Sequence, residues 1–256
     1  MTKKAILVVS FGTSYRQTRE KTIEAIENRL RDAFSDYKLY RAFTSKIIKR
    51  KLGREGIFVF DVEEALKQIL SDGMTELVVQ STHIINGLEY EQMMEVLRSY
   101  ADQFTTIRYG KPLLTSTEDY KELAAIVQKE YPVDGDEVLV LMGHGSEHHA
   151  NSAYPAFAHV LRDMGYHNIF VGTVEGYPAF SEVKKQLEKG KIRKVCLAPM
   201  MIVAGDHATN DMIGKEASWK AELEQEGYEV RYYMKGLGEL GEVQNMFIRH
   251  AKEAFV

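Results

Sequence analysis

The sequence contains little cysteine and no long hydrophobic run. Its single cysteine, Cys196, lies in an apolar segment and cannot form an internal disulfide, so we expect a buried core residue in a reducing compartment. No apolar stretch approaches the ~18 residues that cross a bilayer. The apolar run at residues 5–9 is too short for the core of a signal peptide. We therefore expect a cytoplasmic protein with no membrane partner.

Several common ligand-binding motifs are also missing. No loop ends in the GK[ST] of a phosphate-binding loop, and no GxSxG marks a nucleophilic serine. The first absence argues against a nucleotide held by a phosphate-binding loop, and we expect no organic cofactor. The formal net charge of −4 argues against general binding of nucleic acid.

Short apolar runs alternate with amphipathic helical patterns along the whole chain. The apolar runs predict strands at residues 4–10, 37–44, 76–82, 105–110, 137–142, 168–174, 193–200 and 229–233. The amphipathic patterns predict helices at residues 15–34, 61–72, 87–101, 117–130, 151–164, 179–189, 209–226 and 239–254. This alternation is typical of α/β proteins whose parallel sheets are covered by helices on both faces.

The segment at residues 131–136, YPVDGD, is rich in turn-forming residues and predicts a boundary inside the chain. A chain of 256 residues is long enough for two domains of ordinary size. We expect an N-terminal α/β lobe at residues 1–132 and a C-terminal α/β lobe at residues 133–256. The C-terminal lobe is expected to carry most of the candidate metal ligands that are described below. Each lobe is expected to hold a four-stranded parallel sheet flanked by helices, with a cleft between the lobes.

The two halves of the chain contain a repeat. Residues 5–14, AILVVSFGTS, match residues 137–146, EVLVLMGHGS, and residues 77–94 match residues 195–212 in the same way. In this alignment His144 corresponds to Gly12 and His207 corresponds to Glu89. The repeat is therefore symmetric in its strand, turn and helix pattern but not in its chemistry, because both imidazoles belong to the second half.

Three polar side chains follow consecutive predicted strands of the second half: His144, Glu175 and His207. Ligands of open parallel sheets bind at the carboxyl ends of the strands, so we expect these side chains to converge. Two imidazoles and one carboxylate suit a borderline divalent metal such as cobalt, nickel, iron or zinc. His144 is also suited to act as a general base.

Each of these candidates has a structural alternative. His144 is alternatively a turn histidine bonded to the backbone, Glu175 a solvated turn residue, and the segment around His207 a helix cap. The adjacent His148 and His149 are expected at the surface, with metal delivery as the alternative.

The first half offers further candidates. The segment SFGTS joins a predicted strand to a helix and suits a small anion. It supplies five candidate substrate-binding residues: Ser10, Phe11, Gly12, Thr13 and Ser14. His83 and Glu89 flank the next turn, where Glu89 is expected to be a metal ligand or proton shuttle, or alternatively a first-turn helix carboxylate. The basic run at residues 46–54, with Arg41 just before it, predicts a solvated helix face, or alternatively a surface that attracts a multiply anionic substrate.

Taken together, these segments resemble the class II chelatases, and most closely the anaerobic cobalt chelatases that insert Co²⁺ into sirohydrochlorin on the route to cobalamin. The resemblance runs over nearly the whole chain. It is carried by VVSFGTS (8–14), RAFTS (41–45), QSTHIINGLEYE (80–91), MGHGS with HH (142–149), VEGYP (174–178) and PMMIVAGDHATNDM (199–212). It implies two flavodoxin-like lobes around a cleft that holds a tetrapyrrole with several carboxylates.

The resemblance also implies roles for individual residues. His144 matches the proposed base and metal ligand of the family, and Glu175 and His207 complete the metal site. Glu89 matches a glutamate implicated in the active site. We also expect His83 to contact the substrate.

These expectations describe a metal chelatase, which is a lyase. The substrate metal is expected to be Co²⁺, with Fe²⁺, Ni²⁺ or Zn²⁺ accepted in vitro and no organic cofactor. Iron or nickel insertion by the same class of enzyme is the nearest alternative, because histidine and glutamate ligands do not discriminate sharply among these metals. A non-catalytic protein that binds tetrapyrrole and metal is another, and a phosphatase or isomerase acting near residues 10–14 is a third. The sequence also allows a homo-oligomer.

Overall fold

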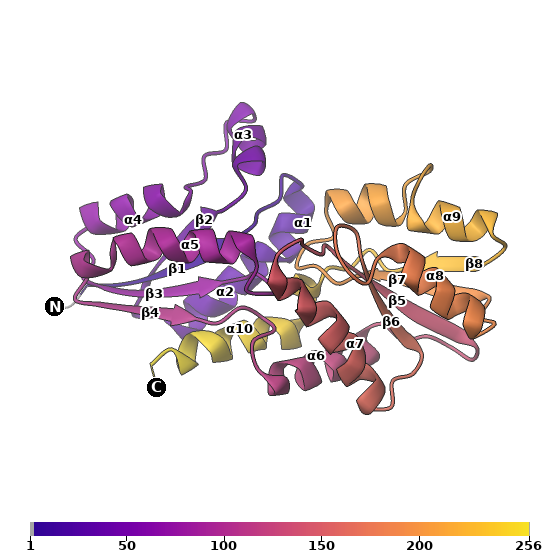
Figure 1. The fold of residues 1–256 in the computed structure, drawn as a ribbon. Coiled ribbons are helices and arrows are strands. Elements are labelled where there is room, and N and C mark those ends of the chain that lie inside the picture. The colour runs from indigo at the N-terminus through magenta and orange to yellow at the C-terminus, as the bar shows by residue number, and fades with distance from the viewer. Residues whose placement is uncertain (1–2, 256) are drawn as a thin grey trace. The chain divides into compact units, whose positions relative to one another are not determined.

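The computed structural model describes residues 3–255, which form two compact units (Figure 1). Unit 1 contains the chain up to Thr115 and the segment from Gly241 onward, and unit 2 contains Ser116–Leu240. Within the described residues, each unit holds one sheet of four parallel strands with helices on its faces. The predicted fold class, two similar α/β lobes, is confirmed.

The strands occupy equivalent positions in the two sheets. The order in unit 1 is β2 (Lys38–Phe43), β1 (Lys4–Ser10), β3 (Glu76–Ser81) and β4 (Thr106–Gly110). The order in unit 2 is β6 (Ile169–Thr173), β5 (Glu137–Gly143), β7 (Lys194–Pro199) and β8 (Glu229–Tyr232). Each of these strands begins and ends close to its predicted position.

The helices of unit 1 are α1 (Arg16–Lys21), α2 (Ile23–Ala33), α3 (Lys46–Arg54), α4 (Val62–Ser71), α5 (Leu88–Ser99) and α10 (Gly241–Glu253), with a 3-10 turn at Ala101–Gln103. Those of unit 2 are α6 (Thr117–Glu130), α7 (Ala153–Asp163), α8 (Phe180–Lys189) and α9 (Trp219–Gln225). Shorter helical turns of unit 2 lie at His149–Ser152, Ala208–Met212 and Leu237–Glu239. Among residues 3–255, no helix is long and apolar enough to cross a bilayer.

The central strand β1 is buried on both of its faces. Ala5, Leu7 and Val9 pack in a core cluster with residues of α4 and α5. Ile6 and Val8 are equally buried and point to the opposite face, because side chains alternate along a strand. That face is covered by α2 and α10 (Figure 1). A strand covered on both sides is apolar nearly throughout, which explains why these runs were recognisable in the sequence.

The helices that complete the two sheets do not follow the order of the chain. α6 comes directly after the strands of unit 1 but packs with α7 in unit 2, whereas α10 returns from the end of the chain to pack on β3, β4 and α2. The buried apolar face of α10 consists of Val243, Met246, Phe247 and Ala251. The chain therefore leaves unit 1 at Thr115 and re-enters it at Gly241, which differs from the expected division between residues 132 and 133.

Three helical segments differ from prediction. The pattern at residues 15–34 is divided at Thr22, whose backbone is not helical (φ −116°, ψ −82°) and whose hydroxyl donates to the Thr18 carbonyl. The pattern at residues 209–226 contains a π-helical turn at Ala208–Met212 and then breaks before α9. α3 is absent from the predicted helices, although its basic residues were expected on a helix face.

The structure corrects the register of the internal repeat. Gly12 and Gly145 both have positive φ angles, +103° and +81°, which places them at equivalent positions. The neighbouring backbone bonds agree, since the Ser45 N–H donates to the Phe11 carbonyl and the Glu175 N–H donates to the His144 carbonyl. His144 therefore corresponds to Phe11, not to Gly12 as the sequence alignment predicts.

Candidate active site

His144, Glu175 and His207 converge in unit 2, as the sequence predicts. They follow β5, β6 and β7, which are neighbours in the sheet, so their loops meet at the carboxyl edge. One ligand atom from each residue lies within 4.8 Å of those of the other two. The two imidazole rings are 4.6 Å apart between centroids and nearly perpendicular, and His144 Nδ1 lies 3.9 Å from Glu175 Oε2.

The hydrogen bond of His144 determines which of its ring nitrogens is available. Its Nδ1 lies 2.8 Å from the carbonyl oxygen of Gly145. A carbonyl oxygen can only accept, so Nδ1 carries the hydrogen in the neutral ring and Nε2 keeps its lone pair. That lone pair can bind a metal or accept a proton.

His207 is held in the same tautomer by a carboxylate. Its Nδ1 lies 2.6 Å from Asp211 Oδ2, so the Nδ1–H donates and Nε2 is again left as the ligand atom. The two residues are joined by the π-helical turn at Ala208–Met212, a rare conformation that is frequent at functional sites. A carboxylate on the second nitrogen of a metal-binding histidine fixes the orientation of the ring and raises its basicity. Sequence reasoning missed Asp211, although its spacing four residues after His207 is a usable signal.

Backbone packing brings the loops of His144 and Glu175 together. A Cβ on Gly145 would lie 2.6 Å from the backbone nitrogen of Gly176, so only glycine allows this approach. Asn151 joins the same two loops, because its side chain accepts from the Ser146 N–H at 3.0 Å and donates to the Tyr177 carbonyl at 2.7 Å. The separation of the two candidate ligands is therefore set by a close backbone contact and by the hydrogen bonds of Asn151.

Tyr154 packs against the loop that carries His144. Its ring fills the space that a Cβ on Gly143 would occupy, at 2.3 Å. The backbone of His144 and Gly145 hydrogen-bonds to its hydroxyl, but burial is the dominant effect and raises the pKa of Tyr154 above its usual range. The hydroxyl is therefore neutral and acts as a fixed polar anchor. Its place on α7 gave no distinctive signal in the sequence.

The candidates of the first half form a separate group within unit 1. Glu89 lies in the first turn of α5, as the alternative assignment to a first-turn helix carboxylate predicts. Its Oε2 lies 3.7 Å from His83 Nε2 and 3.4 Å from Thr44 Oγ1. His83 Nδ1 in turn lies 2.7 Å from Ser81 Oγ. A half-exposed carboxylate beside an imidazole is an arrangement that can pass a proton.

All three hydroxyl-bearing residues of the SFGTS loop, Ser10, Thr13 and Ser14, are buried. Ser10 Oγ accepts from the Thr82 hydroxyl at 2.8 Å, and Thr13 Oγ1 accepts from the Tyr15 N–H at 3.2 Å. Phe11 is instead 42% exposed, so this loop also presents an aromatic surface. Anion binding by the loop stays a prediction.

His148 and His149 make contacts that involve no metal. His148 caps the short helical turn at His149–Ser152, because its Nδ1 accepts from the Ala150 N–H at 3.3 Å. The rings of His148 and His149 are 4.0 Å apart between centroids. His149 is exposed, as expected, and His148 is partly buried. Neither contact tests a part in metal delivery.

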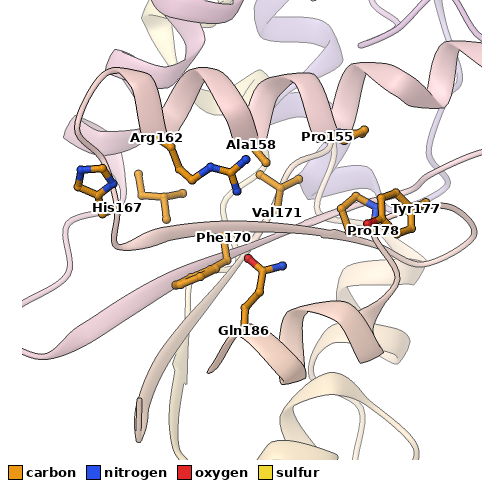
Figure 2. Close-up of a pocket in the computed structure, with 10 residues that line it drawn as sticks. Pro155, Ala158, Arg162, His167, Phe170, Val171, Tyr177, Pro178 and Gln186 are labelled. Atoms are coloured by element: carbon orange, nitrogen blue, oxygen red, sulfur yellow. The ribbon is translucent and has the colours of Figure 1, made fainter. Parts of the chain in front are cut away.

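A cavity of about 150 Å³ lies on the outer side of β6 (Figure 2). It is lined by Arg162 of α7, Phe170 of β6, Gln186 of α8 and, among loop residues, Tyr177. None of His144, Glu175 and His207 lines it, so it is distinct from the candidate metal-ligand group that these three side chains form.

Comparison with known proteins shows which family the chain matches. The chain matches the family model for cobalt chelatase (CbiK) over residues 4–256. It is 40% identical over 255 residues to the sirohydrochlorin cobaltochelatase of Salmonella typhimurium, covering 98% of this chain and 96% of that protein. It is 34% identical over 259 residues to the sirohydrochlorin cobaltochelatase CbiKC of Nitratidesulfovibrio vulgaris, covering 99% and 91%.

Solved structures show the same fold at lower identity. SirB from Bacillus subtilis with Fe³⁺ gives a TM-score of 0.68 at 18% identity, covering 99% of this chain and 96% of that one. CbiX, described as the terminal enzyme of siroheme biosynthesis in denitrifying bacteria, gives 0.59 at 19% identity, covering 98% and 99%. The family match extends over nearly all of the chain, and the protein therefore belongs to the cobalt chelatase (CbiK) family of metal chelatases.

Proposed function

We propose that this chain inserts Co²⁺ into sirohydrochlorin, with His144, Glu175 and His207 holding the metal before insertion. The observation that carries the proposal is the convergence of these three side chains, with both imidazoles fixed so that Nε2 is free. The family match and the names of the two curated relatives support the choice of cobalt and of this tetrapyrrole.

Insertion exchanges two pyrrole protons for one dication, with no change of oxidation state. The uncatalysed reaction is slow because a flat macrocycle hides its nitrogen lone pairs. Binding that bends the ring would cost about 1–5 kcal/mol, drawn from contacts with its periphery. Three protein ligands leave coordination positions open for the ring nitrogens, which then replace the protein ligands one after another.

His144 is the proposed acceptor of a pyrrole proton. Its Nδ1 already donates to the Gly145 carbonyl, so Nε2 must serve both metal and proton. The two roles are therefore sequential, and the ring must begin to take the metal before His144 is protonated. General-base catalysis of this kind contributes about 10²–10⁴-fold to the rate. Glu89, beside His83, is the proposed route for a further proton.

The test is anaerobic absorbance of sirohydrochlorin mixed with catalytic amounts of the protein and Co²⁺, with Fe²⁺ and Ni²⁺ in parallel. We expect many turnovers for wild type and none for His144→Ala. His159→Ala is a matched control, because His159 is an exposed helix histidine elsewhere in unit 2. A stoichiometric spectral shift without turnover would identify a binding protein instead. No shift at all would favour the phosphatase or isomerase alternative.

The parallel assays with Fe²⁺ and Ni²⁺ show which metal the protein inserts fastest. Faster insertion of Fe²⁺ or Ni²⁺ than of Co²⁺ would replace cobalt in the proposal and leave the site assignment intact. The cytoplasmic location, the lack of an organic cofactor or nucleic-acid partner, and the oligomeric state stay predictions from the sequence.

A further inference from the structure

Unit 1 contains an element that its counterpart lacks. Residues 44–61 connect β2 to α4 and include α3, whereas the equivalent connection from β6 to α8 is only residues 174–179. Figure 1 shows α3 standing away from the sheet of unit 1. An extra helix in one copy of a duplicated scaffold is not needed to complete that scaffold.

α3 begins at the edge of the sheet where ligands bind. Its N-cap is Ser45, whose hydroxyl accepts from the Ile48 N–H and whose own N–H donates to the Phe11 carbonyl. Ser45 occupies the position of Glu175 in the repeat. The helix is therefore anchored at the carboxyl edge of unit 1, where open parallel sheets bind their ligands.

The charged side chains of α3 are all of one sign. The helix carries five basic residues and no acidic one in an overall acidic chain. Lys49 is neutralised by Asp61 and Glu64, at 2.7 and 2.6 Å. Within residues 3–255, Lys46, Arg50 and Arg54 form no ion pair, and their spacing of four residues places them on one exposed side of the helix.

Apolar side chains accompany these cations. Ile47, on the same helix, is 75% exposed, and Phe58, just after it, is 91% exposed. Tyr15 is 38% exposed, and Lys51 Nζ lies 5.4 Å from the centroid of its ring. Exposed apolar groups on the same segment as unpaired cations suit a ligand with a flat apolar body and a rim of carboxylates.

We propose that α3 is the substrate-recognition element of unit 1, and that Lys46, Arg50 and Arg54 bind peripheral carboxylates of the tetrapyrrole. This inference rests on the proposed function. Arg41 has no part in it, because its guanidinium pairs with the buried carboxylate of Glu27. The cations of α3 attract the macrocycle and hold its rim, and they do not touch the metal.

The test is the triple variant Lys46→Gln, Arg50→Gln, Arg54→Gln. The control is Lys67→Gln, Lys185→Gln, Lys189→Gln, which removes the same charge from exposed helix positions on α4 and α8. Exposed ion pairs are individually weak, so three lost together are expected to raise KM for sirohydrochlorin about tenfold. We expect kcat and KM for Co²⁺ to stay within about twofold, and the control to match wild type.

Two further measurements sharpen this test. The salt dependence of KM for sirohydrochlorin should flatten in the α3 variant, because screening acts on the removed charges. Binding of a metal-free porphyrin with eight carboxylates, followed by its fluorescence, should weaken in the variant more than binding of a porphyrin with two. An unchanged KM, or an equal rise in the control, would overturn the proposal. The proposal would also be overturned if the α3 variant bound anionic vesicles more weakly than wild type while KM for sirohydrochlorin stayed unchanged. That result would make α3 a membrane-binding helix.

The porphyrin measurement also separates this inference from the proposed function. A wild-type protein that inserts no metal would refute the proposed function through the turnover assay. Loss of binding of the eight-carboxylate probe in the α3 variant would still identify α3 as the binding element for a polycarboxylate macrocycle. Turnover in wild type with unchanged probe binding in the variant would instead refute the role of α3 alone.

Discussion

Replacing Asp211 with alanine tests whether the carboxylate behind His207 prepares that imidazole for metal. In the structure Asp211 Oδ2 lies 2.6 Å from His207 Nδ1, which keeps Nε2 free. Without the carboxylate, the ring loses its fixed orientation and either nitrogen can carry the hydrogen. We therefore expect weaker binding of Co²⁺ with little change in the fold.

The size of the effect follows from the surroundings of the pair. Loss of such a partner typically lowers metal affinity 10–100-fold. The side chains of His207 and Asp211 are 34% and 42% exposed, so water replaces part of the lost bond. We therefore expect the lower end of this range, about tenfold or ~1.4 kcal/mol. Asp211→Asn, which keeps an acceptor but loses the charge, should fall between wild type and alanine.

The assay is titration of Co²⁺ in the absence of tetrapyrrole, followed by the visible absorption of the bound ion. Insertion kinetics should then show a raised KM for Co²⁺ and an unchanged KM for sirohydrochlorin. Asp163→Ala is the matched control, since Asp163 forms an equivalent i,i+4 pair with His159, at 3.3 Å on the surface of α7. Equal Co²⁺ affinity in wild type and Asp211→Ala would refute the reasoning.

Two further predictions concern unit 2. Gly145→Ala should be destabilised more than Gly135→Ala in urea or thermal unfolding, by at least about 1 kcal/mol. Both positions have positive φ, but an added Cβ is crowded by backbone only at Gly145 and meets nothing within 4 Å at Gly135; equal losses would contradict this. The second prediction concerns the reactivity of Cys196. This residue is fully buried, and burial raises the pKa of its thiol to about 12. A thiol reagent at pH 8 should therefore label the native protein at least about a thousandfold more slowly than the unfolded chain, and rapid native labelling would show that the strand is open.

The strands were predictable because burial on both faces makes them continuously apolar. In β5, for example, Val138, Leu139 and Val140 are all buried, so the run stands out without any knowledge of its neighbours. The partners of α6 and α10 were not predictable in this way. An amphipathic helix shows that it has a face to bury, but not which sheet receives it, and local sequence around residues 131–136 suggests a boundary that long-range packing overrides.

The metal-ligand group was predictable because strand order places consecutive strand ends together. His144, Glu175 and His207 needed only the rule that parallel sheets bind ligands at their carboxyl edge. The supporting residues were harder to find. Tyr154 acts through a tertiary contact with Gly143 and gives no local signal. The one-residue error in the repeat arose because Gly12 and His144 aligned by letter pattern, whereas the positive φ of Gly12 and Gly145 fixes the true register.

In the corrected register, the two copies of the scaffold carry different side chains at three equivalent positions. The positions that hold His144, Glu175 and His207 in unit 2 hold Phe11, Ser45 and Glu89 in unit 1. A second set of two imidazoles and a carboxylate would compete for the ion without advancing its transfer to a ring. The replacements instead leave an exposed aromatic side chain and the cap of a basic helix at the same edge. On the two proposals above, unit 2 carries the metal-binding side chains and unit 1 carries the surface for a large anionic ligand, and the difference lies in the side chains at three equivalent positions.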